Sequence, residues 1–76
     1  MNLKEFYKAW QETQKYQREY VVIKTDDGII KADWYDIQPE SRTIEGGKEI
    51  VFLYCDYKRV ATIQIEDIKN IYCGGD

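Results

Sequence analysis

Carboxylates are the side chains of this sequence best suited to do chemistry, and they occur in three close pairs. The pairs are Asp26 with Asp27, Asp33 with Asp36, and Glu66 with Asp67. Two neighbouring carboxylates can raise a pKa for general acid catalysis or hold a hard cation. The sequence has no histidine, which excludes Ser-His and Cys-His catalysis and histidine-based metal motifs.

Local structure accounts for these pairs better than catalysis does. Asp26 and Asp27 precede Gly28, and Asp-Gly is a strong signal for a hairpin turn. Glu66 and Asp67 interrupt a strand pattern, where carboxylates can accept backbone N–H bonds at a corner. Asp33 and Asp36 fall on opposite faces of a regular strand, so they form no ready-made site. We therefore predict a protein without catalytic residues, metal ligands or a cofactor.

The cysteines, the glycines and the net charge make further classes of function unlikely. Cys55 and Cys73 have no metal-binding spacing, so two free thiols are predicted. The Gly-Gly pairs lack the lysine and the helix of a phosphate-binding loop. With no apolar run of about 20 residues and no signal peptide, a cytoplasmic protein without a membrane anchor is expected. The net charge of −3 disfavours non-specific nucleic-acid binding.

Aromatic residues are abundant for a chain of 76 residues: seven Tyr, two Trp and two Phe. A core this small cannot hide all of them, and Tyr and Trp are enriched at binding hot spots. The candidates for exposure are Trp34, Tyr35, Tyr57 and Tyr72. They form a partner-binding surface or cap the ends of the fold.

A helix is predicted within residues 1–18. Asn2 is a good N-cap, and Glu5, three residues later, completes a capping box. Leu3, Phe6 and Trp10 follow helical spacing and make an aromatic-rich stripe. This stripe either covers the sheet that follows or docks into a partner.

From residue 20 onward the hydrophobic period changes to two, which indicates strands. Strands are predicted at 20–25, 29–37, 42–45 and 48–57, followed by 58–65 and a short last strand. Ile68 and Ile71, three residues apart, suggest one turn of 3₁₀ helix near the final corner. The strand at 48–57 is hydrophobic on both faces, so its outer face belongs under the helix or in a homodimer.

This order of a capped helix, short strands and a late corner resembles the Sm-like and SH3-like small barrels. Asp27-Gly28 resembles the turn after the first strand of these barrels, and the segment from Ile63 to Ile68 resembles their isoleucine-rich last segment. The resemblance implies a single α+β, mainly β domain. An N-terminal helix (1–18) precedes a five-stranded antiparallel barrel (19–73) and a tail (74–76). The arginine-glycine step of the Sm RNA pocket is replaced here by Gln64-Ile65.

These observations predict a non-enzymatic protein-binding module, with the profile of small inhibitors and adaptors encoded by phages and mobile elements. The expected partner is a protein with a basic surface, met by an aromatic and acidic rim. The predicted partner-binding residues are Asp33, Trp34, Tyr35, Asp36, Tyr57, Glu66, Asp67 and Tyr72. The alternative is an Sm-like oligomer that binds nucleic acid or sequesters a nucleotide.

Overall fold

The computed structural model describes residues 1–16, 20–38 and 49–74, and it begins with helix α1 (Leu3–Gln14). The predicted capping box is confirmed. The Asn2 side chain accepts a bond from the Glu5 N–H (2.8 Å), and the Glu5 carboxylate accepts one from the Asn2 N–H (2.9 Å). Within the described residues, no helix has the length and apolar character that crossing a bilayer requires.

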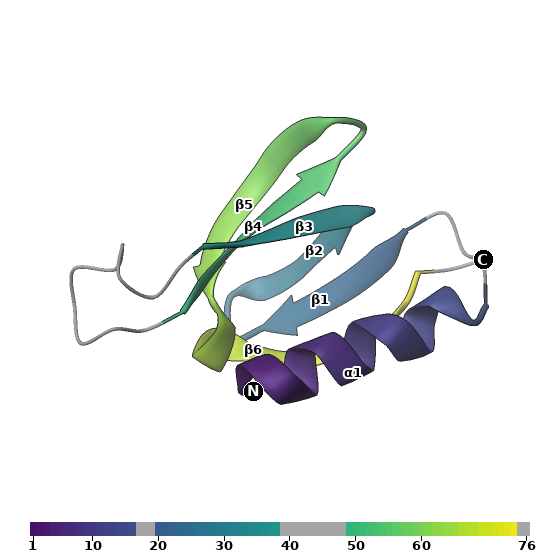
Figure 1. Ribbon diagram of the computed structural model, residues 1–76. Coiled ribbons are helices and arrows are strands. Elements are labelled where there is room, and N and C mark those ends of the chain that lie inside the picture. Colours follow the sequence, from purple (N-terminus) through teal and green to yellow (C-terminus); the bar gives the residue numbers. More distant parts are fainter. Residues whose placement is uncertain (17–19, 39–48, 75–76) are drawn as a thin grey trace.

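Six strands follow the helix in the described part of the chain, in two antiparallel sheets (Figure 1). They are β1 (Val21–Thr25), β2 (Gly28–Ala32), β3 (Trp34–Gln38), β4 (Ile50–Cys55), β5 (Lys58–Gln64) and β6 (Ile68–Cys73). The first sheet has the order β2-β1-β6 and the second β3-β4-β5. A 3₁₀ turn, η2 (Ile65–Asp67), joins β5 to β6. Figure 1 shows the β4–β5 turn projecting on the side of the molecule away from α1.

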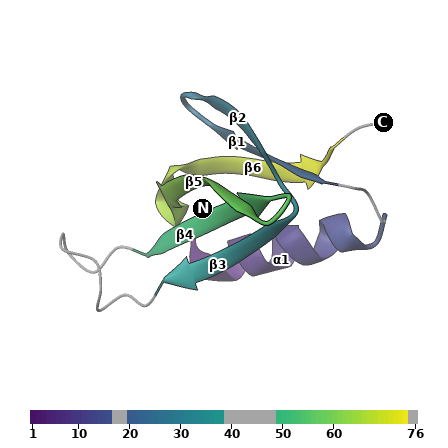
Figure 2. The ribbon, with the colours of Figure 1, turned by 90° about the horizontal axis from the view of Figure 1, so that it is seen from above.

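The core lies between the helix and the inner faces of both sheets. Phe6 and Trp10 of α1 are 0% and 4% exposed, which confirms that the helix belongs to the fold. They pack with Ile23 of β1 and with Leu53 of β4. Figure 2 shows α1 running along one side of the two sheets. Burial of this aromatic stripe therefore holds the helix to the sheets.

The expected closed five-stranded barrel is wrong. The predicted strand at 29–37 divides at Asp33 into β2 and β3, which belong to different sheets. The side chains that face the core are at even-numbered positions before Asp33 (Ile30 and Ala32) and at odd-numbered positions after it (Tyr35 and Ile37). The sheets thus share a bent segment without closing through hydrogen bonds. The predicted strand at 42–45 lies outside the described residues.

The corner before the last strand is one turn earlier than predicted. The 3₁₀ turn contains Ile65, Glu66 and Asp67, whereas Ile68 and Ile71 both lie in β6. An irregularity in the β1–β6 pairing lets both isoleucines face inward, because Thr25 pairs with Ile68 while Lys24 pairs with Asn70. The spacing of three thus reflects a β-bulge and not a helical turn.

Candidate functional site

A hollow of about 500 Å³ lies where the β2–β3 bend meets the β4–β5 turn. We call it the aromatic hollow, and it is lined by Asp33, Trp34, Tyr54, Asp56 and Tyr57. Trp34 and Tyr54 are directly paired across β3 and β4, so their side chains share the outer face of the second sheet. Backbone register therefore sets the floor of this hollow.

Asp33 connects the two turns that border the aromatic hollow. Its N–H donates to the Tyr54 carbonyl (2.8 Å), and its Oδ2 accepts a bond from the Asp56 N–H (3.0 Å). Asp56 and Tyr57 both have positive φ, 54° and 68°. A positive φ is uncommon for residues other than glycine, although aspartate tolerates it. The Asp33 carboxylate thus supports a turn with an unfavourable backbone.

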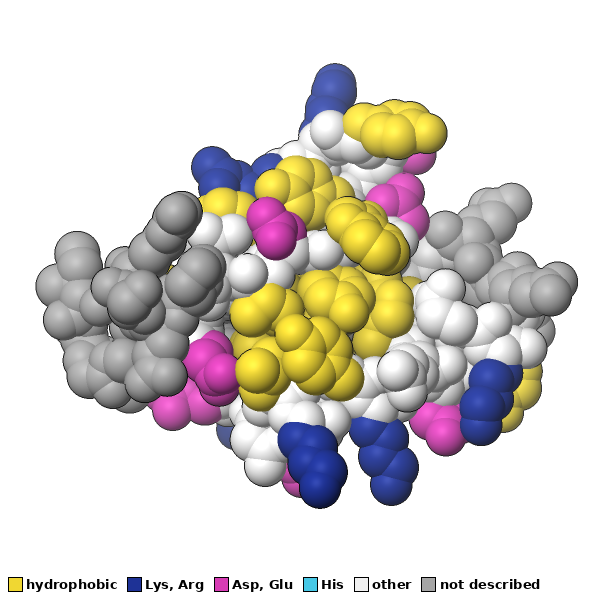
Figure 3. Space-filling model, viewed as in Figure 1, with side chains coloured by type: hydrophobic (Ala, Val, Ile, Leu, Met, Phe, Trp, Pro, Cys, Tyr) yellow, Lys and Arg dark blue, Asp and Glu magenta, His cyan; other side chains and the backbone are white. Residues whose placement is uncertain are grey.

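Two large aromatic side chains stand open at this site. Tyr57 is fully exposed and Trp34 is 60% exposed. The indole of Trp34 stacks on the ring of Tyr35, with centroids 5.4 Å apart and an interplanar angle of 25°. Figure 3 shows hydrophobic side chains at the centre of one face and at the tip above it, with acidic side chains between them. Aromatic surface and negative charge therefore occur side by side.

Tyr35 lies mostly on the other side of the sheet from the aromatic hollow. It is half-buried, and its ring meets those of Phe6 and Trp10 edge-on, with ring centroids 5.0 Å and 4.7 Å away. Burial, with a smaller contribution from Tyr7, raises the pKa of the Tyr35 hydroxyl. Tyr35 therefore links the exposed indole of Trp34 to the aromatic core, which limits how far Trp34 can move.

Three possible metal ligands lie beside the aromatic hollow. The carboxylates of Asp33 and Asp56 and the thiol of Cys55 are within 4.8 Å of one another. Burial raises the pKa of the Cys55 thiol, the charges of Asp56 and Asp33 raise it further, and Lys31 opposes them. These three side chains form an acidic cluster around a thiol of raised pKa beside the aromatic hollow.

The remaining predicted site residues lie elsewhere. Asp36 is exposed on β3 and accepts a bond from the Gln38 side chain (3.3 Å). Tyr72 is 42% exposed on β6, in the first sheet. Asp67 borders a second hollow of about 270 Å³, together with Asp26 and Asp27.

The predicted rim needs the acidic segments at Asp33 to Asp36 and at Glu66 and Asp67 to lie together, but the structure separates Asp33 from Glu66 and Asp67. Trp34 pairs with Tyr54 at one end of the second sheet. At the other end Ile50 pairs with Gln64, immediately before Glu66 and Asp67 in η2. Of the predicted residues, Asp33, Trp34 and Tyr57 line the aromatic hollow, and Tyr35 stacks on Trp34.

Two residues of the aromatic hollow, Tyr54 and Asp56, are absent from the predicted set. The strand predicted at 48–57 placed Asp56 inside a continuous ladder, whereas the structure has a two-residue turn of Asp56 and Tyr57. Aspartate is a poor strand former, and this was the signal in the sequence that a turn interrupts the pattern.

The reactivity of Cys55 provides a test of this geometry. Asp56→Asn removes a negative charge near the thiol, so the pKa of Cys55 should fall and its alkylation by iodoacetamide at mildly alkaline pH should become faster. The rate is measured in a Cys73→Ser background. Asp36→Asn serves as the control and should leave the rate unchanged. Equal rates in the Asp56→Asn variant and the parent would contradict the described cluster.

Comparison with models of known protein families, with curated proteins and with solved structures finds no match to this chain.

Proposed function

We propose that this chain is a non-enzymatic protein-binding module, an inhibitor or adaptor, that binds its partner through the aromatic hollow. The observation that carries the proposal is the fully exposed Tyr57 beside the 60% exposed Trp34 and two carboxylates. Large aromatic side chains in water are available to be buried by a partner. Tyr and Trp are also the residues that most often dominate the energy of an interface.

The carboxylates give this surface a preferred kind of partner. Asp33 and Asp56 have no ion-pair partner within residues 1–16, 20–38 and 49–74. A basic side chain on the partner would complement them, and opposite charges speed association and favour the correct orientation. This supports a protein partner that presents positive charge near an apolar contact.

The nucleic-acid alternative has less support. The chain carries a net charge of −3, and the aromatic hollow adds two carboxylates where a phosphate backbone would need cations. A homodimer through the outer face of β4 stays a prediction. On that face Ile50, Phe52 and Tyr54 are half-buried, while Val51 and Leu53 face the core.

The proposal is tested by capture and then by measurement with purified proteins. The immobilised chain is incubated with lysate, a retained protein is identified by mass spectrometry, and its affinity is measured by calorimetry. Trp34→Ala combined with Tyr57→Ala should weaken binding by about 2 kcal/mol or more, about 30-fold. Both side chains are exposed, so thermal unfolding should stay close to that of the parent.

The matched control is Tyr16→Ala combined with Ile29→Ala, which removes two exposed side chains, one aromatic and one aliphatic, away from the aromatic hollow. This control should bind like the parent. A partner whose affinity is equally unchanged in the Trp34 and Tyr57 variant would refute the proposed site. Retention of nucleic acid that declines steeply with salt would favour the alternative function.

A further inference from the structure

Resting on the proposed function, we propose that the aromatic hollow receives one arginine side chain of the partner protein. The guanidinium group pairs with the carboxylates of Asp33 and Asp56 and lies against the exposed aromatic rings. This assigns the hollow a ligand chemistry: a planar, singly charged cation presented on a protein.

Carboxylate oxygens that no group of the described residues occupies are the first support. Asp33 uses its Oδ2 to hold the Asp56 N–H, and within the described residues its other oxygen and both oxygens of Asp56 accept no hydrogen bond. Neither carboxylate is in an ion pair there. A guanidinium presents several N–H donors in one plane and can bond two acceptors at once. Two acceptors on different turns are matched better by the forked guanidinium than by the single point charge of an ammonium group.

Available ring surface is the second support. Tryptophan gives the strongest cation–π attraction, and Trp34 is largely exposed while Tyr35 holds it from one side. Tyr57 is open to solvent on the β4–β5 turn, and Tyr54 also lines the hollow. A cation entering the hollow thus meets aromatic carbon as well as carboxylate oxygen.

The same sheet already stacks a guanidinium on a ring. The Arg59 guanidinium carbon is 4.4 Å from the centroid of the Phe52 ring. Phe52 and Tyr54 alternate onto the same face of β4, so this contact lies beside the hollow. Arg59 is engaged there and forms no ion pair with Asp33 or Asp56. The intramolecular pair therefore illustrates the contact that we propose for the partner.

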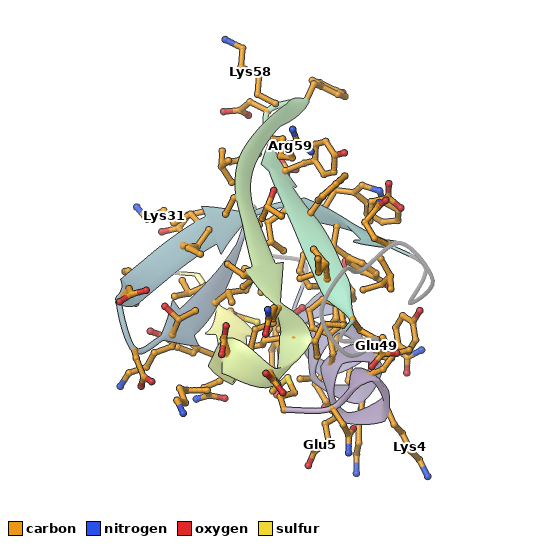
Figure 4. The ribbon with its side chains drawn as sticks, turned by 90° about the vertical axis from the view of Figure 1, so that its left-hand side faces the viewer. Lys4, Glu5, Lys31, Glu49, Lys58 and Arg59 are labelled. Atoms are coloured by element: carbon orange, nitrogen blue, oxygen red, sulfur yellow. The ribbon has the colours of Figure 1, made fainter. Side chains whose placement is uncertain are left out.

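Neighbouring cations restrict the ligand to a lone arginine. Figure 4 shows Lys58 at the tip of the β4–β5 turn, Arg59 below it and Lys31 on β2. Lys31 is close enough to lower the pKa of Cys55. These charges repel a run of basic residues more strongly than they repel one guanidinium, which can bond both carboxylates. The lysine ammonium is more strongly hydrated than guanidinium, which favours arginine in a partly apolar hollow.

The test uses three short peptides that differ at one residue: acetyl-Gly-X-Gly-amide, where X is arginine, lysine or citrulline. Binding is followed in ¹⁵N–¹H spectra through the indole N–H of Trp34, and the indole of buried Trp10 provides an internal reference. The arginine peptide should shift the Trp34 signal saturably, with a dissociation constant on the order of 1 to 10 mM. Lysine should bind about fivefold more weakly. Citrulline, which is neutral, should not saturate.

Variants of the chain locate the site. Trp34→Ala is followed through the backbone N–H of Asp56, and this variant should weaken arginine binding about fivefold or more. Asp33→Asn combined with Asp56→Asn should do the same, while asparagine retains an acceptor for the turn. Asp36→Asn is the control and should bind like the parent. A triarginine peptide should gain no more than the roughly threefold statistical advantage of its three side chains.

Equal binding of arginine and citrulline, or of arginine and lysine, would overturn the arginine assignment. So would a triarginine peptide that binds far beyond the statistical gain. These failures are separate from failure of the proposed function. Partner capture that needs Trp34 and Tyr57, combined with no response to the arginine peptide, would leave the binding surface in place and refute only its ligand.

Discussion

Replacing Trp10 with alanine is expected to lower the free energy of unfolding by about 3 to 5 kcal/mol. Trp10 is 4% exposed, and its ring contacts those of Phe6 and Tyr35, so truncation removes buried area and leaves a cavity beside these two rings. A domain of this size has a total stability of only about 4 to 11 kcal/mol. Urea denaturation measured by circular dichroism should therefore show a large shift of the midpoint.

Tyr16→Ala is the matched control for this prediction. Tyr16 is an aromatic residue just after the same helix and is 64% exposed, so its loss should change stability by about 0.5 kcal/mol or less. A Trp10 variant as stable as the Tyr16 variant would show that α1 does not contribute to the core in solution.

Leu53→Ala is expected to destabilise the fold by about 2 to 5 kcal/mol. Leu53 is 0% exposed at the middle of β4, where it pairs with Tyr35 of β3 and Ala61 of β5. It belongs to the central cluster that joins the second sheet to the helix. Thermal unfolding of the variant should begin at a markedly lower temperature.

The comparison for Leu53 is Val60→Ala on the neighbouring strand β5. Val60 is 49% exposed, so its truncation should cost about 0.5 kcal/mol or less. If both variants unfolded at the same temperature, the inner face of β4 would not be the buried one, and the assignment of its two faces would have to be reversed.

Local signals in the sequence predicted the helix and the first turn, because each depends on a few adjacent residues. The capping box of Asn2 and Glu5 and the turn before Gly28 require no distant partner, and Gly28 adopts a φ of 135°. The bend at Asp33 was missed although the change of parity between Ala32 and Tyr35 is readable in the sequence. Its cause is tertiary: each half of the bent segment pairs with a different sheet.

The candidate site was predicted in part for the same reason. Exposure of Trp34 and Tyr57 follows from an excess of aromatic residues over what a small core can hold, and this excess is visible in composition. The position of Asp56 depends on a turn with two positive φ values, and no glycine marks this turn in the sequence. The separation of Asp33 from Glu66 depends on strand register, which single-sequence patterns do not determine.

The order of strands in the first sheet has a consequence for how the chain is made. β1 pairs with β6 from the far end of the sequence, and α1 packs on β6, whereas β4 and β5 form a local hairpin. Pairing between distant segments costs loop-closure entropy before any stabilising contact forms, so such pairing forms later than a hairpin. During synthesis the two local hairpins, β1–β2 and β4–β5, are therefore expected to form before β1 pairs with β6. The core between α1 and β1 lacks one of its walls until β6 leaves the ribosome, and we expect this interval to be when the nascent chain is most open to aggregation and proteolysis.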